Sequence, residues 1–132
     1  MAVFQFPVRV YYEDTDAGGV VYHARYLHFY ERARTEFLRT LHFSQQQLLS
    51  EYRIGFVVKS MNIDYRVAAK LDDLLLVETH VTEMKGATIL FYQVLKRDEL
   101  ILSTATVKVA CVDLGKMKPK PLPEEVRNGF LQ

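Results

Sequence analysis

The sequence predicts an α+β fold in which a curved antiparallel sheet of five strands wraps around one long central helix. Two observations support this prediction. One long amphipathic helical pattern comes early in the chain, and four strand-like segments then follow one another with short connections. Short connections favour antiparallel hairpins, because a parallel return needs a crossover of about a dozen residues or more. A helix followed by a run of strands is typical of the α+β class.

The first half of the chain supplies one strand and two helices. Residues 6–12 alternate in the manner of a strand, and Pro7 places the start of this strand at an edge of the sheet. Residues 24–41 repeat apolar side chains at three- and four-residue spacing, which predicts the long helix. Its apolar stripe is rich in aromatics, so we expect the sheet to enclose it. Ser44 and Gln47 form a capping-box pattern that starts a short second helix.

The second half of the chain changes to a period of two, which is the period of a strand. Residues 57–67 show this alternation, and three more long β-type runs follow at residues 74–84, 88–96 and 100–113. Lys59 is the one charged residue on the apolar face of the first segment. Residues 124–130 predict a short last helix.

The composition is that of a single globular domain spanning residues 1–132. Hydrophobic residues make up 49% of the chain and charged residues 25%. The formal net charge of +1 argues against nucleic-acid binding and against a polybasic membrane binder. The single cysteine, Cys111, excludes an internal disulfide, and we expect it to be buried and inert. Without a long apolar run or a leader pattern, we expect no integral membrane association and a cytoplasmic protein.

The segment 11–23, between the first strand and the long helix, combines three carboxylates, two glycines, three tyrosines and a histidine. Backbone N–H groups at a helix start can stabilise an oxyanion, and a nearby carboxylate can act as a base or nucleophile. One interpretation makes Asp14 and Asp16 turn formers. A calcium loop is rejected, because Arg25 stands where the bidentate Glu is required. A third interpretation is metal-free catalysis by Asp16 and His23.

A long motif supports the catalytic interpretation. The chain carries VRVYYEDTDAGGVVYHARYL from Val8 to Leu27, then YERAR at 30–34. These runs resemble the YbgC-type acyl-CoA thioesterases, which belong to the 4-hydroxybenzoyl-CoA thioesterase family of hotdog-fold proteins. The resemblance implies a hotdog fold and hydrolysis of an acyl-CoA to a free acid and CoA. It also implies that Asp16 is the catalytic aspartate, that the helix start at His23 polarises the thioester carbonyl, and that Tyr12 accompanies them.

CoA carries phosphates, so basic and polar residues should contact it. The candidate substrate-binding residues are Lys59, Ser60, Arg66 and Lys85, with Arg97, Lys116, Lys118 and Lys120 as further basic candidates. Any one of these basic residues is more often a solvated charge. No phosphate-binding glycine loop is present, and no two histidines show metal-ligand spacing with a carboxylate, so we expect neither a metal nor a cofactor.

The resemblance also implies partners. Hotdog proteins form dimers through joined edge strands and often dimers of dimers, so we expect a homodimer or homotetramer in which one chain supplies Asp16 and the other shapes the acyl pocket. Since the YbgC-type family is associated with the Tol–Pal envelope system, an alternative is a partner of that system or of acyl carrier protein with little turnover. A dehydratase is a third class, against which the Asp16 motif argues. The acyl chain length and the choice between nucleophile and general base stay open.

Overall fold

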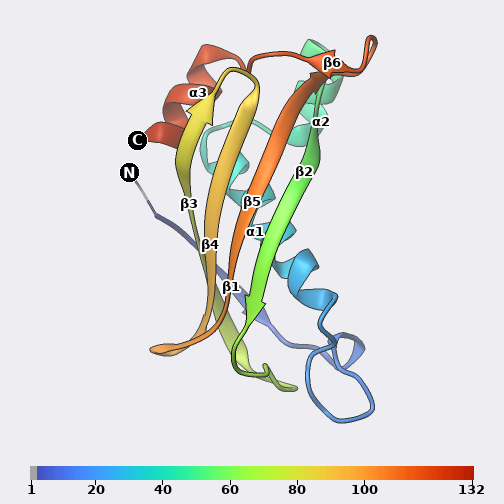
Figure 1. Cartoon of the computed structure of the whole chain (residues 1–132), viewed down its shortest axis with the longest axis vertical. Helices are drawn as coiled ribbons and strands as arrows, with labels where there is room; N and C mark the ends of the chain where they lie inside the picture. The colour runs from blue at the N-terminus through green and yellow to red at the C-terminus, as the bar shows by residue number, and fades with distance from the viewer. Residues whose placement is uncertain (1–2) are drawn as a thin grey trace.

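The computed structural model describes residues 3–132. Met1 and Ala2 lie outside the described residues, so the expectation about a leader is not tested there. The elements follow the predicted order (Figure 1). The strands are β1 (Phe4–Arg9), β2 (Ile54–Tyr65), β3 (Leu74–Lys85), β4 (Thr88–Arg97), β5 (Leu100–Asp113) and β6 (Lys118–Pro119). The helices are α1 (Arg25–Thr40), α2 (Gln45–Gln47) and α3 (Glu124–Leu131), with a 3-10 turn η1 (Tyr12–Asp14) and a π-helical turn η2 (Leu48–Tyr52).

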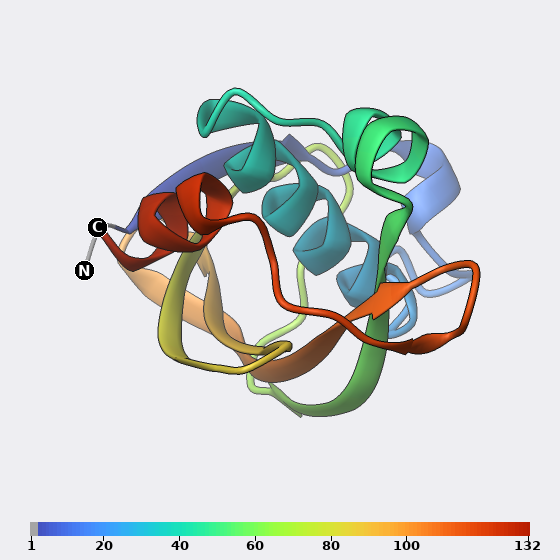
Figure 2. The ribbon, with the colours of Figure 1, turned by 90° about the horizontal axis from the view of Figure 1, so that it is seen from above.

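One antiparallel sheet curls around α1, as Figure 2 shows from above. Its strand order is β1-β3-β4-β5-β2, and the two-residue β6 pairs with the end of β5. The predicted sheet of five long strands around a long helix is therefore confirmed, and β6 is an addition that the sequence pattern did not indicate. The aromatic stripe of α1 faces the sheet, and its buried residues are Tyr26, Phe29, Tyr30, Ala33, Phe37 and Leu38.

A polar network crosses the core between α1 and the sheet. Gln93 on β4 is 0% exposed, and its Nε2 donates to the Tyr30 carbonyl and to Thr79 Oγ1, each at 2.9 Å. Arg34 Nη1 donates to Gln93 Oε1 at 3.0 Å. The Tyr30 hydroxyl donates to Ser103 Oγ at 2.7 Å, and burial raises the pKa of Tyr30. These bonds attach the middle of α1 to three strands.

The first strand ends earlier than the alternation predicted. β1 stops at Arg9, and Tyr12 lies in the turn η1 rather than in the strand. The Asp14 carboxylate accepts the Tyr11 N–H at 2.8 Å, and the Asp14 N–H donates to the Tyr11 carbonyl at 3.0 Å. These two bonds fold the chain back before Tyr12 can pair with β3. The edge position indicated by Pro7 is confirmed, since β1 is an outer strand.

The edge strand β2 contains the irregularity that the sequence hinted at. It pairs with β5 from Ile54 to Tyr65, and the register shifts between Val58 and Ser60. Lys59 is thus the extra residue of a bulge, which explains why a charge interrupts the apolar face of this segment. β2 begins earlier and ends earlier than predicted.

Two smaller expectations can be compared with the structure. Cys111 is buried, and that burial raises the pKa of its thiol to about 11, as expected of a structural cysteine. Within residues 3–132, no helix is long and apolar enough to cross a membrane.

Candidate active site

The segment between β1 and α1 forms a closed loop. Thr15 and Val21 pair as an isolated antiparallel bridge, and the Asp16 N–H donates to the Val20 carbonyl at 2.9 Å. Asp14 is only 4% exposed, and its carboxylate lies 3.8 Å from Nε of Arg25. Asp14 therefore builds the loop, as the turn-former interpretation predicted for it.

Asp16 lies on the outside of this loop. Its Oδ1 accepts the Gly18 N–H at 2.8 Å, and Gly19 has a φ of +79°, a conformation that favours glycine. The turn-former geometry is therefore present at Asp16 as well. Its Oδ2 makes no hydrogen bond to any residue between 3 and 132, and the side chain is exposed. One carboxylate oxygen is thus held by the Gly18 N–H, and the other has no protein partner within the described residues.

The start of α1 offers two free donors, the first of them seven residues after Asp16 in the chain. The N–H groups of residues 25, 26 and 27 each donate to the carbonyl three residues earlier, at 2.8, 3.3 and 3.2 Å. The N–H groups of His23 and Ala24 have no acceptor within the described part of the chain. Because the helix dipole favours negative charge at this end, the two free N–H groups form a site suited to an oxyanion.

A segment distant in the sequence, the connection between β2 and β3, holds the loop in place. The Val21 N–H donates to the Ala69 carbonyl at 2.8 Å, and Val20 pairs with Lys70 as an isolated bridge. The Val10 N–H donates to the Asp73 carbonyl at 2.9 Å. The connection between β2 and β3 is thus part of the framework that shapes the loop.

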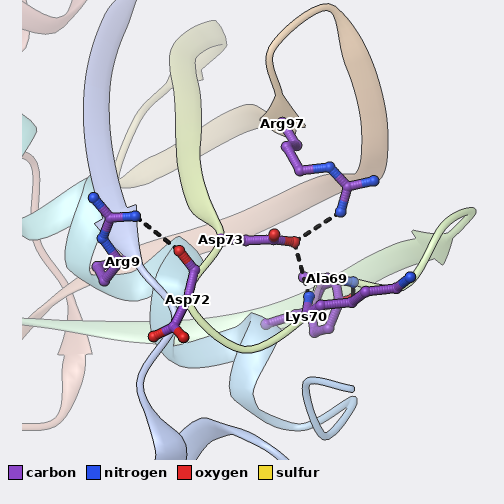
Figure 3. A network of polar contacts seen from close by, with 7 residues as sticks. Arg9, Ala69, Lys70, Asp72, Asp73 and Arg97 are labelled. Atoms are coloured by element: carbon purple, nitrogen blue, oxygen red, sulfur yellow. Dashed lines mark hydrogen bonds and ion pairs between the residues drawn. The ribbon is translucent and has the colours of Figure 1, made fainter. Parts of the chain in front are cut away.

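That connection is fixed in turn by charged side chains, as Figure 3 shows. Asp73 accepts the Lys70 N–H at 2.9 Å and Nη1 of Arg97 at 2.7 Å, and Arg9 Nη1 donates to the Asp72 carbonyl at 2.7 Å. Partial burial by itself raises the pKa of the Asp73 carboxyl, but the hydrogen bonds from Lys70 and Arg97 outweigh burial, so that its pKa is lowered. Arg97, a candidate for CoA binding, is therefore engaged in an internal ion pair.

Two tyrosines join the helix start to this framework, and sequence reasoning missed both of these contacts. The Tyr26 hydroxyl accepts the Ala69 N–H at 3.0 Å. The Tyr65 hydroxyl, at the end of β2, donates to the His23 carbonyl at 2.9 Å. Their partners are 43 and 42 residues away in the chain, and no local pattern indicates such pairs.

The predicted site residues are only partly brought together. Asp16 and His23 lie at the two ends of the loop. Tyr12 is 83% exposed, and its hydroxyl has no hydrogen-bond partner in residues 3–132. Arg66 directly follows Tyr65 and so lies near the helix start, whereas Lys59 and Ser60 occupy the middle of the exposed edge strand.

Lys85 lies at the opposite end of the sheet from Asp16. It ends β3, whose first residue adjoins Asp73, and a strand of that length spans about 36 Å. There Lys85 lines a cavity of about 230 Å³ together with Glu83 and Lys108. The lysines of the tail are also remote in sequence from the loop, and Lys120 Nζ donates to the Tyr52 carbonyl at 3.3 Å. Any contact of these lysines with a substrate at Asp16 of the same chain would need a long ligand.

A larger cavity of about 560 Å³ opens between α1, α2 and the start of β2. Its apolar wall includes Leu38, Ile54, Phe56, Phe91, Val109 and Phe130, and Arg34 and Glu31 add charge. This volume is in the range of small-molecule sites. Glu31, the lining residue nearest to His23 along this helix, follows it by eight residues, or about 12 Å, so the cavity is separated from the helix start.

Comparison with known proteins identifies the family. The pattern of the Thioesterase-like superfamily matches residues 10–130. The chain belongs to this superfamily. It is 74% identical over 127 residues to the acyl-CoA thioesterase YbgC of Haemophilus influenzae, an alignment that covers 96% of this chain and 93% of that protein. It is 53% identical over 131 residues to the acyl-CoA thioester hydrolase YbgC of Escherichia coli, covering 98% and 97% of the two chains.

Solved structures of thioesterases share the architecture. A probable thioesterase from Bartonella henselae superposes with a TM-score of 0.88 at 41% identity, covering 92% of this chain and all of that one. A 1,4-dihydroxy-2-naphthoyl-CoA thioesterase from Synechocystis superposes with a TM-score of 0.92 at 26% identity, covering 99% and 97%. The family resemblance, the hotdog fold and the expectation of an enzyme are thereby confirmed for this member of the superfamily.

Within residues 3–132, no group of three or more His, Cys, Asp and Glu side chains is placed to hold a metal ion.

Proposed function

We propose that the chain is an acyl-CoA thioesterase that hydrolyses an acyl-CoA to a free acid and CoA, with Asp16 and the helix start at His23 as its reaction centre. The observation that carries the proposal is the 74% identity, over nearly the whole chain, to a protein named as an acyl-CoA thioesterase. The loop geometry supports it, because a free carboxylate oxygen and two open N–H groups occur within nine residues of one another.

The N–H groups of His23 and Ala24 would bind the carbonyl oxygen of the thioester. Attack on the carbonyl carbon moves negative charge onto this oxygen, and donors already in place stabilise that charge without rearranging. Removal of one such donor in other acyl-transfer enzymes costs about 3–4 kcal/mol of transition-state stabilisation. Two fixed N–H groups at a helix start therefore supply a substantial part of the catalysis.

Asp16 would act in one of two ways. As a nucleophile, its carboxylate adds to the carbonyl carbon, the carbon–sulfur bond breaks, CoA leaves as a thiolate that takes up a proton, and water hydrolyses the mixed anhydride. As a general base, Asp16 takes a proton from water, the resulting hydroxide adds to the carbonyl, and the proton passes to the leaving sulfur. The bond from Gly18 orients the carboxylate in both routes.

The edge strand β2 supports assembly of two copies. It is twelve residues long and lies at the outside of the sheet, and three of its large apolar side chains, Val57, Val58 and Tyr65, are 42–47% exposed. Such an open edge invites another strand. Two copies could pair their β2 strands antiparallel about a two-fold axis near the middle of the strand. The unpaired backbone groups of both edge strands would then be hydrogen-bonded.

This pairing would complete the active site. An antiparallel arrangement sets the Ile54 end of β2 opposite the Tyr65 end of the second copy. The cavity of about 560 Å³ lies at the Ile54 end, and Tyr65 contacts His23. The acyl group held at Asp16 of one copy would thus enter the cavity of the other. Arg66, Lys59 and Ser60, on or beside the same edge, would then lie along the route of the CoA moiety.

The test is CoA release measured with a free-thiol reagent across a panel of acyl-CoA chain lengths. Asp16→Asn should reduce kcat by at least about 100-fold, a loss typical of a catalytic acid–base group. It should leave the unfolding temperature unchanged, because the amide oxygen can still accept the Gly18 N–H. Asp98→Asn, at an exposed turn, is the matched control and should retain full activity. Substantial activity of Asp16→Asn would contradict the assignment of the reaction centre.

Other outcomes of the same assay would favour the alternative functions. Tight binding of acyl-CoA or of an acylated carrier protein without thiol release would indicate a binding partner, and an alkene product would indicate a dehydratase. After a single turnover in H₂¹⁸O, label in the Asp16 carboxylate would establish the nucleophile route, because it enters there only when water attacks the aspartyl carbonyl of a mixed anhydride. Light scattering distinguishes a dimer from a tetramer.

A further inference from the structure

We propose that Tyr65 is a positioning residue for the thioester oxygen: its hydroxyl fixes and polarises the peptide group whose N–H, at Ala24, faces the developing negative charge. This inference rests on the proposed function, since it concerns the donors at the same helix start. It adds a residue from the edge strand β2 to a site otherwise built from a single loop.

The geometry begins with one peptide plane. The His23 carbonyl and the Ala24 N–H belong to the same peptide group, which is rigid and planar, so fixing one end fixes the direction of the other. The Tyr65 hydroxyl donates to the His23 carbonyl oxygen at 2.9 Å. The helix itself contributes only a longer bond to this oxygen, from the Tyr26 N–H at 3.3 Å. Tyr65 therefore supplies the shorter of the two bonds that orient this peptide.

The same hydrogen bond also strengthens the donor. A hydrogen bond accepted by a carbonyl draws electron density toward its oxygen and makes the N–H of that peptide a better donor, which is the cooperative effect seen in chains of hydrogen bonds. The carbonyl of the preceding peptide group also accepts a hydrogen bond. This group consists of the Tyr22 carbonyl and the His23 N–H, and its carbonyl accepts the Arg25 N–H at 2.8 Å. Both free donors thus sit on peptides whose carbonyls are occupied.

The surroundings of Tyr65 keep its hydroxyl in the donating form and in place. Its ring meets the Tyr26 ring edge to face at 5.0 Å and the His23 ring at 6.3 Å. Partial burial, with a smaller effect of Tyr26, raises the pKa of the Tyr65 phenol above its usual value, so it stays protonated at neutral pH. A ring that served packing alone would not need a hydroxyl, yet this hydroxyl donates to the carbonyl that shares a peptide group with the free Ala24 N–H.

The test compares Tyr65→Phe with Tyr92→Phe. The Tyr92 ring packs against the His80 ring, and its hydroxyl has no hydrogen-bond partner within residues 3–132. Tyr65→Phe retains the ring contacts. We expect kcat for acyl-CoA to fall by about 3- to 10-fold, less than for loss of a whole donor, with KM and the unfolding temperature unchanged. Tyr92→Phe should keep full kcat. A kcat for Tyr65→Phe within twofold of wild type, or an equal rise in KM, would overturn the inference.

Vibrational spectroscopy measures how strongly the backbone N–H donors polarise the thioester carbonyl. The carbonyl stretch of a ¹³C-labelled acyl-CoA bound to Asp16→Asn should lie at lower frequency than in water, and adding Tyr65→Phe should reverse part of that shift. An unchanged frequency would contradict the polarising role. If Asp16→Asn itself still hydrolyses the thioester, the reaction centre assigned under the proposed function fails instead, so the two failures are distinguishable.

Discussion

Gln93 offers a stringent test of how α1 is attached to the sheet. It is 0% exposed and takes part in three hydrogen bonds, to the Tyr30 carbonyl, to Thr79 Oγ1 and from Arg34 Nη1. Gln93→Leu keeps a similar shape and removes all three. At about 1 kcal/mol net for each bond, the free energy of unfolding should fall by about 3 kcal/mol. For a chain of 132 residues, that loss corresponds to a decrease of about 10 °C in Tm.

The assay is thermal unfolding followed by far-UV circular dichroism at one fixed protein concentration, because association would make Tm depend on concentration. Gln5→Leu is the matched control, since Gln5 is exposed and makes a single bond to Glu78 at 3.2 Å. It should change stability by less than about 0.5 kcal/mol. If Gln93→Leu unfolds within about 2 °C of this control, the buried network does not stabilise the fold as argued.

Two further predictions concern pH. Burial raises the pKa of Tyr30 in the folded protein, so the contribution of this phenol to stability is complete below its unfolded pKa of about 10 and is lost as the pH rises further. In urea titrations, the stability of the wild-type protein should therefore decline at alkaline pH. Tyr30→Phe should reduce the slope of that decline by up to about 1.4 kcal/mol per pH unit. Hydrogen bonds lower the folded pKa of Asp73, so its contribution is present above the unfolded value of about 3.9 and is lost as pH falls through the folded pKa. Asp73→Asn should destabilise at pH 6 and approach wild type near pH 2, and an equal deficit at both pH values would contradict this reasoning.

Most of the fold could be predicted because its elements are periodic. The segment 100–113 is a long β-type run whose residues 104–109 alternate strictly, and β5 has those same bounds. The end of the first strand was harder to predict. Tyr12 continues the alternation of β1, but Asp14 folds the chain back through the Tyr11 N–H, and a side-chain bond of that kind leaves no period in the sequence. Lys59 was visible as an exception, and the bulge in β2 is its cause.

The part of the candidate site formed by residues close together in the sequence could be predicted. The contacts between residues far apart in the sequence could not. Asp16, Gly18 and His23 lie within one short loop, so their association could be inferred from order along the chain. Tyr65 reaches His23 only because β2 runs the length of the sheet and ends beside the helix start. Contacts of that kind depend on the length of a strand and the curvature of the sheet, and neither can be read from the identity of single residues.

The bonds between the loop and the connection of β2 to β3 have a consequence for the order of folding. Val20 and Val21 pair with Lys70 and Ala69, about fifty residues later in the chain. During synthesis from the amino terminus, the loop between β1 and α1 therefore cannot make these bonds until β2 and that connection have left the ribosome. The segment 11–23 is translated early, but its final shape depends on residues that are translated about fifty positions later.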